Sequence, residues 1–236
     1  SIRANHSAVH LDDRNATWGV TEDNPLWQEL REGGSFAGEA FLLNVALNGQ
    51  NEITAVFAGD MQEAHRRGCD VVSRHAIVAV EEAFDIVVTS NSGYPLDLNM
   101  YQAVKGMSAA AQIVRPGGHI VIAADCWDGI PAHGDYGKML AEAESVEALL
   151  ALVRSGQAPS QDAWQAHLHA LICQKATVHF YSDNLTARQV ESAFMQPCRD
   201  VSDTVARLLR GLPAAATVAA LPQGPQTVAR LPVAQG

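Results

Sequence analysis

The sequence predicts an α/β fold, a layered sandwich with a mostly parallel central sheet flanked by helices. Two observations support this prediction. Short apolar runs typical of strands alternate with helical stretches along the 236 residues, and strands that are joined through helices favour parallel pairing. A hydrophobic content of 47% is enough to bury a full core. No internal repeat is present.

The first half contains a hairpin and two further strands. Residues 41–47 and 52–57 flank Asn48-Gly49, and Asn-Gly supplies the positive φ angles of a tight turn. Asp60 is expected to cap a helix that runs to about Arg74. Residues 76–80 and 84–89 have the pattern of strands.

The remaining elements alternate between helices and strands. A helix from about Asp97 is expected to end at the Arg115-Pro116-Gly117-Gly118 stop. The later expectations are a strand at 119–124, helices at about 135–155 and 160–172, a strand at 176–181, and helices near 186–194 and 199–210. Residues 216–220 and 226–230 are expected to be edge strands, and the alternative is a loosely ordered tail.

We expect one domain over residues 1–236, with 1–34 as an interdomain or linker region and 216–236 as edge strands or a tail. Ser1 stands where a start Met is usual, and no helix start follows it. The sequence therefore has the character of a chain cut from a longer one.

The composition argues against several classes of protein. A net charge of −10 with scattered basic residues argues against a nucleic-acid partner. No apolar run reaches the ~18 residues of a membrane span, and no signal peptide opens the chain. The four cysteines show no CxxC pairing, which favours a reduced, cytoplasmic protein.

The strongest candidate site follows the strand at 84–89. Loops at the carboxyl ends of parallel strands bind ligands, and loops 89–97, 124–135 and 181–186 are expected there. Tyr101 and Lys105 share a helix face with Gln102 beside it, and Lys105 is the only charged side chain between Asp97 and Arg115. These three side chains can hold a carboxylate, and the alternative is that Lys105 reaches into water at the sheet rim.

Other candidates have weaker patterns. Asp125 and Cys126 close a strand and are either ligand contacts or caps, and Cys126 needs a paired base to act as a nucleophile. His6 and His10 have the spacing of a metal pair on a helix but also of a surface pair. His167 and His169 point to different helix faces, His65 is expected on a solvated face, and Trp164 is expected in the core. No nucleotide-binding or hydrolase motif of the common kinds is present.

Several segments resemble the C-terminal half of the LarA lactate racemase family, the nickel-pincer-nucleotide enzymes. The most specific segment is 89–110, with SNSGYP at 90–95 and YQAVKG at 101–106. Shorter similarities lie at 5–6, 22–25, 57–60, 64–66, 124–129, 162–165 and 221–225. Together they cover nearly the whole chain.

The resemblance implies a cofactor and a substrate. A nickel ion would be held by a pyridinium-derived mononucleotide and by a histidine, whose counterpart here is His6. The substrate would be a small 2-hydroxy acid that transfers hydride to the cofactor and regains it on either face. Tyr101, Gln102 and Lys105 would grip this substrate in an interdomain cleft that Trp164 also lines.

The chain also departs from the family. The lysine that carries the cofactor and the two proton-transferring histidines have no counterpart here. We therefore expect no catalytic residue in this chain, an N-terminal catalytic domain outside it, and no activity of the chain alone. The loop 127–133 differs from lactate-specific members, so another 2-hydroxy acid is an open alternative.

Three hypotheses follow from these observations. The first is the substrate-binding part of a 2-hydroxyacid racemase or epimerase. The second is a non-catalytic α/β module that binds a small carboxylate or phosphate. The third is that this half mainly buttresses its own N-terminal domain and closes over it, which would show as an otherwise unexplained apolar patch.

Overall fold

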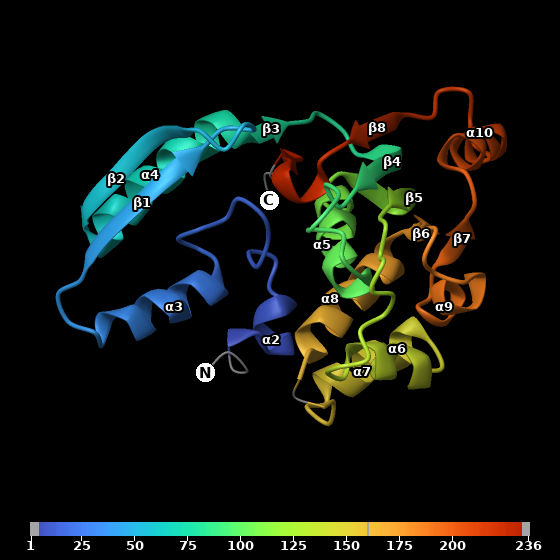
Figure 1. Ribbon diagram of the computed structural model, residues 1–236, viewed down its shortest axis with the longest axis horizontal. Helices are drawn as coiled ribbons and strands as arrows, with labels where there is room; N and C mark the ends of the chain where they lie inside the picture. The colour runs from blue at the N-terminus through green and yellow to red at the C-terminus, as the bar shows by residue number, and fades with distance from the viewer. Residues whose placement is uncertain (1–4, 160, 233–236) are drawn as a thin grey trace. The chain divides into compact units, whose positions relative to one another are not determined.

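The structure is a computed structural model that describes residues 5–159 and 161–232 (Figure 1). The chain divides into two compact units, Ser1–Val78 and Ala79–Gly236. The division falls within the short strand β3 (Ile77–Ala79). The expected assignment of 1–34 to a linker region and of 216–236 to edge strands or a tail stays a prediction.

The first unit contains a hairpin and a long helix. Its elements are α2 (Ala8–Leu11), α3 (Pro25–Ser35), β1 (Phe41–Leu47), β2 (Ile53–Asp60) and α4 (Met61–Ala76). The predicted hairpin is confirmed, since β1 and β2 pair antiparallel. The left-handed residue of its turn is Asn51, with φ 62°, and not Asn48 or Gly49. The Asn48 side chain instead accepts the amides of Gln50 and Glu52, both at 2.9 Å.

Helix α4 begins where Asp60 predicts it. The Asp60 carboxylate accepts the amides of Gln62 and Glu63, as an N-cap residue does. The helix packs on one face of the hairpin, and the Phe57 ring lies so close to Gly68 that a Cβ there would be 3.3 Å from it. One face of the hairpin is therefore covered by α4.

The second unit holds a five-stranded sheet in the order β7-β6-β5-β4-β8, and every neighbouring pair is parallel. The sheet strands are β4 (Phe84–Ser90), β5 (Val114–Ala123), β6 (Thr177–Tyr181), β7 (Gln196–Cys198) and β8 (Val218–Leu221). The connecting helices are α5 (Met100–Ala111), α6 (Tyr136–Glu142), α7 (Val146–Arg154), α8 (Ala163–Lys175), α9 (Ala187–Ser192) and α10 (Val201–Gly211). The turn η1 (Gly224–Gln226) and β9 (Val228–Arg230) end the described chain. The predicted α/β fold with a parallel sheet is confirmed.

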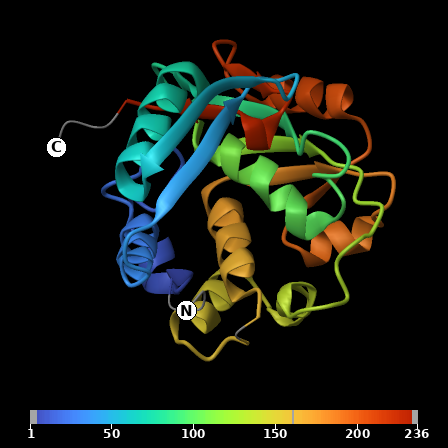
Figure 2. The same cartoon turned by 60° about the vertical axis from the view of Figure 1, so that its left-hand side comes forward.

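Helices cover both faces of this sheet (Figures 1 and 2). On one face Leu208 of α10 packs with Ile86, Val121 and Cys198 of the strands. Successive strand residues point to opposite faces, so the fully buried Val87 and its neighbours in β5 face α5 and α8. Three layers result, with a core on each side of the sheet.

Several predicted boundaries were wrong. Helix α5 ends at Ala111 rather than at Arg115, because residues 114–118 already form the start of β5. The expected helix at 135–155 is two helices, since Ser145 accepts the amide of Ala148 and starts α7. Strand β7 was not predicted. Strand β8 lies at the sheet edge, as expected.

No helix among the described residues combines the length and the apolarity that crossing a membrane requires.

Candidate functional site

The predicted site residues Tyr101, Gln102 and Lys105 lie on α5, which starts just beyond the carboxyl end of β4 (Figure 1). Asn99 caps this helix, because its side chain accepts the amide of Gln102 at 3.1 Å. In the sheet, β5, β6 and β7 follow one another on one side of β4, and β8 lies on its other side. The direction in which strands are added to the sheet therefore changes at β4. Ligands bind at such points in parallel sheets.

The loop before α5 is held by the loop after β5. The amide of Cys126 donates to the carbonyl of Asp97 at 2.9 Å, and the amide of Met100 donates to the carbonyl of Gly129 at 3.0 Å. The side-chain amide of Asn99 also donates to the carboxylate of Asp128 at 3.0 Å. The loops 89–97 and 124–135 therefore fix the first turn of α5, where the predicted substrate residues begin.

Glycines bring α5 against the sheet. The amide of Gly106 donates to Asn91 at 2.8 Å. A Cβ on Gly106 would lie 2.5 Å from the carbonyl oxygen of Ser90, and one on Gly224 would lie at the same distance from that atom. Both positions exclude a side chain, which explains why glycine follows Lys105 in the sequence.

Lys105 and Gln102 form a polar pair. The Lys105 ammonium is exposed and donates to the Gln102 side-chain oxygen at 2.7 Å. No acidic side chain in the described parts of the chain forms an ion pair with Lys105. An ammonium has three donors, so this pair still offers two ammonium hydrogens and the Gln102 amide hydrogens. The arrangement suits a carboxylate or another small anion.

Tyr101 lies beside Trp164, the other residue that the resemblance assigns to the substrate cleft. The Trp164 indole hydrogen-bonds the Tyr101 phenol, and the adjacent Gln165 donates to the Tyr101 carbonyl at 2.6 Å. Burial raises the pKa of Tyr101 above its usual value, and nearby Asp162 adds to this, while the Trp164 hydrogen bond opposes it. The phenol is therefore neutral near pH 7 and can donate a hydrogen bond.

A buried pair behind Tyr101 was missed in the sequence. The ring of Tyr136 packs edge-on against Tyr101 at 5.4 Å between centroids. The Tyr136 hydroxyl lies 2.8 Å from Nδ1 of His169, whose Nε2 lies 2.8 Å from the carbonyl of Ala193. Nε2 must carry the proton to donate to that carbonyl, so Nδ1 accepts from Tyr136. No local pattern links these residues, which are 33 positions apart.

The structure argues against Cys126 as a nucleophile. Its side chain is buried, and burial with Asp97 and Asp125 nearby raises its pKa to about 12. Such a thiol stays protonated and unreactive. Asp125 accepts from Asn184 at 2.7 Å and so joins the loops after β5 and β6.

The histidines do not build a metal centre. Within residues 5–159 and 161–232, no group of three or more His, Cys, Asp or Glu side chains is placed to hold an ion. His6 and His10 belong to the first unit, and the His10 Nδ1 atom lies 3.2 Å from the carbonyl of Asn5. The ring of His65 stacks on that of Trp27, with 5.9 Å between the ring centroids. The expectation that His65 lies on a solvated helix face was therefore wrong.

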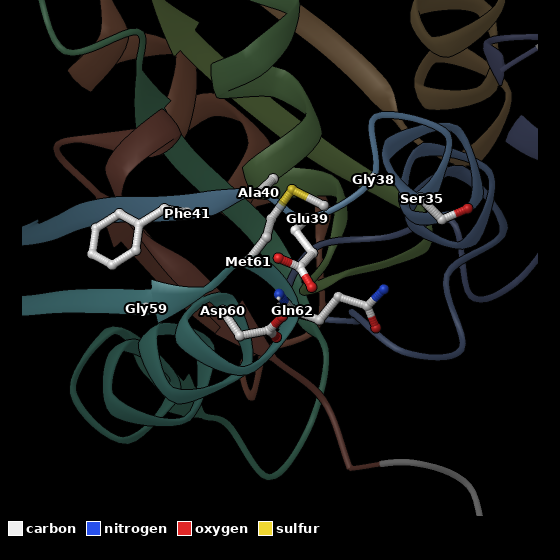
Figure 3. A pocket seen from close by; sticks show the side chains of 9 residues that line it. All are labelled: Ser35, Gly38, Glu39, Ala40, Phe41, Gly59, Asp60, Met61 and Gln62. Atoms are coloured by element: carbon white, nitrogen blue, oxygen red, sulfur yellow. Dashed lines mark hydrogen bonds between the residues drawn. The ribbon is translucent and has the colours of Figure 1, made fainter.

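One cavity of about 660 Å³ lies in the first unit, at the start of α4 (Figure 3). Its lining comes from residues 35–41 and 59–62, and the side chains of Glu39, Met61 and Gln62 gather at its centre. None of the predicted site residues lines it. Its size alone does not make it a functional site.

Comparison with known proteins decides the family. The family model of the lactate racemase C-terminal domain matches residues 78–229. The chain belongs to this lactate racemase family. It is 35% identical over 205 residues to the lactate racemase of Thermoanaerobacterium thermosaccharolyticum, a match that covers 86% of this chain and 48% of that protein. It is 31% identical over 225 residues to the lactate racemase of Lactiplantibacillus plantarum, with coverages of 95% and 53%.

The solved structure of a lactate racemase agrees with this assignment. The apoprotein of the Thermoanaerobacterium thermosaccharolyticum lactate racemase matches with a TM-score of 0.89 and 32% identity, over 97% of this chain and 55% of that one. A Thermotoga maritima protein matches with a TM-score of 0.64 at 11% identity, over 90% of this chain and 55% of that one, which shows a shared fold. The chain thus spans about half the length of the lactate racemases it matches.

Proposed function

We propose that this chain is the substrate-binding C-terminal part of a nickel-pincer-nucleotide-dependent racemase or epimerase of 2-hydroxy acids. The observation that carries the proposal is the cluster of Tyr101, Gln102, Lys105 and Trp164 at the start of α5, in a chain of the lactate racemase family. The complete protein would hold this chain together with an N-terminal half of the kind that its relatives have. The four free cysteines are compatible with a cytoplasmic location.

Each residue of the cluster has a distinct role in this proposal. The Lys105 ammonium neutralises the substrate carboxylate, and Gln102 hydrogen-bonds it and orients Lys105. The neutral Tyr101 phenol donates to a substrate oxygen, and Trp164 fixes the direction of that phenol. The chain binds and orients the substrate, and the groups that accept and return a proton lie outside it.

His6 is the one residue proposed to contact the cofactor. An imidazole suits nickel, and His6 would be one protein ligand beside the donors of the nucleotide itself. Among the described residues no group of three or more His, Cys, Asp or Glu side chains is placed to hold an ion without it. When bound, the nickel-pincer nucleotide would accept and return the hydride of the 2-hydroxy acid. No other step follows from the residues of this chain.

The second candidate is a non-catalytic module that binds a small carboxylate or phosphate. It is favoured by one observation: the whole cluster from Tyr101 to Trp164 lies in the second unit, which needs no cofactor to present its donors. The two candidates differ in whether bound 2-hydroxy acid is racemised.

Lys105→Ala in the complete, cofactor-loaded protein tests the assignment. We expect the KM for the 2-hydroxy acid to rise roughly 10- to 100-fold, because a charge-assisted hydrogen bond worth about 1.5–3 kcal/mol is lost. Calorimetry with lactate on the cofactor-free protein should show the same loss of affinity.

Lys138→Ala is the matched control, since Lys138 is an exposed lysine on α6 whose nearest acid is Glu142 at 4.0 Å. Its kinetics should match those of the unchanged protein. Equal KM values for the Lys105 and Lys138 variants would contradict the proposal. Binding that depends on Lys105 without any racemisation would instead support the non-catalytic module.

A further inference from the structure

One face of the β1–β2 hairpin is apolar and exposed. In the antiparallel register Leu43 faces Ala58 and Val45 faces Val56, so these side chains share a face with Phe41. A register shift between Ala46 and Leu47 places Ile53 opposite Leu47 at the end of this face. Phe41 is 77% exposed, Leu43 68%, Ile53 63% and Val56 59%. We call the surface made by Phe41, Leu43, Val45, Leu47, Ile53 and Val56 the hairpin face. Figure 3 shows the Phe41 ring pointing away from the cavity at the start of α4.

The hairpin face needs a partner on physical grounds. Helix α4 packs on the opposite side of the hairpin, around Phe57, and leaves this side uncovered among the described residues. A two-stranded sheet is only marginally stable by itself, and a contiguous exposed apolar patch marks an interaction site.

The strand edges show the same feature. Solitary edge strands are normally protected by charges or proline, and β1 contains neither. In β2 the only charged residue is Asp60, at its last position. The hairpin therefore has the composition of strands inside a larger sheet whose apolar face is covered.

The comparisons indicate what covers it. The family model of the C-terminal domain begins at residue 78, where the contacts also divide the chain. A lactate racemase nevertheless matches 95% of the chain, so most of the first unit has a counterpart outside that C-terminal domain. About half of each relative lies beyond the match.

We propose that the hairpin face docks on the N-terminal half of the complete protein, which covers its apolar side. This proposal rests on the proposed function for the existence of that half. It makes residues 41–60 part of an interface within one polypeptide, whereas the carboxylate site lies entirely on the second unit.

Cysteine labelling tests the proposal. Leu43→Cys and, as the matched control, Ala206→Cys at an exposed position on α10 are each made in the 236-residue chain and in the complete protein. N-Ethylmaleimide labelling is followed by intact mass, and the unchanged proteins give the background of the four native cysteines. We expect Leu43→Cys to react at least about tenfold more slowly in the complete protein, while Ala206→Cys reacts equally in both.

Two results would overturn the proposal. Equal labelling of Leu43→Cys in both proteins would show that the N-terminal half does not cover the face. Slow labelling of Leu43→Cys already in the 236-residue chain would also overturn it. If dilution restores fast labelling, a second copy covers the face, and if it does not, the chain covers the face itself. Val56→Cys, on the facing strand, repeats the test should Leu43→Cys fold poorly. Labelling involves neither Lys105 nor turnover, so it can fail or succeed independently of the proposed function.

Discussion

In the proposed function, the hydrogen-bonded pair of Lys105 and Gln102 is the anion-binding part of the site. The ammonium is exposed, and its hydrogen bond to Gln102 restricts where it points. Tyr101 contributes in a different way, because burial keeps its phenol protonated. The pair supplies charge and the phenol supplies direction.

Tyr136 is expected to position Tyr101 rather than to contact substrate. Tyr136→Phe keeps the ring that packs on Tyr101 but leaves the buried Nδ1 of His169 without its donor, at a cost of about 1–3 kcal/mol. We expect a lower urea midpoint and a modest rise in the KM for the 2-hydroxy acid, with kcat little changed. A Tyr136→Phe protein with unchanged KM and unchanged stability would show that the hydroxyl has no positioning role.

The thiol of Cys126 is expected not to react with alkylating reagents in the folded protein. Its buried thiol, with a pKa of about 12, should not react with iodoacetamide at pH 8 in the folded protein, whereas the partly exposed Cys69 should react first. Peptide mapping after alkylation measures both sites. Rapid modification of Cys126 would restore the nucleophile hypothesis that the burial of this residue now argues against.

At the scale of elements, α5 depends on its glycine. A Cβ on Gly106 would lie 2.5 Å from the backbone oxygen of Ser90, which cannot move away as a flexible side chain would. Gly106→Ala should therefore cost about 2–4 kcal/mol, as overpacking against fixed atoms does. Gly211→Ala, at the end of α10 with open space around it, is the control and should be neutral or slightly stabilising. Urea unfolding compares the two, and equal midpoints would contradict the close approach.

The elements also show what local sequence can predict. Asp60 predicted the start of α4, because an N-cap acts on its next three residues. Strand β7 was missed since it has only three residues and contains Pro197, and its pairing with β6 comes from tertiary contact. The spacing of Tyr101 and Lys105 predicted a shared helix face. No spacing predicted the hydrogen bond between Tyr101 and Trp164, which only the family resemblance brought together.

At the scale of the whole molecule, the parallel sheet buries histidines that have to remain neutral. Nε2 of His179 on β6 lies 3.3 Å from Nδ1 of His119 on β5. The charge of Arg207 acts on both rings, and that of Arg115 acts on His119. Burial, His119 and Arg207 lower the pKa of His179 to about 4, and burial lowers that of His169 to about 4 as well. The native second unit thus binds fewer protons than the unfolded chain between the ordinary histidine pKa and about 4.

Acid should therefore destabilise this unit in a defined window. Because the unfolded state takes up the protons that the native state refuses, the histidine contribution to the free energy of unfolding falls as pH drops from about 6.5 towards 4. The expected loss is a few kcal/mol, and it is measured by urea unfolding of the 236-residue chain from pH 7.5 to pH 4.5. His179→Asn removes one titrating group and should flatten the profile even if it lowers stability at pH 7.5. His133→Asn, at an exposed loop position, should leave the slope unchanged. Parallel profiles for all three proteins would show that His179 is not the source of the acid sensitivity.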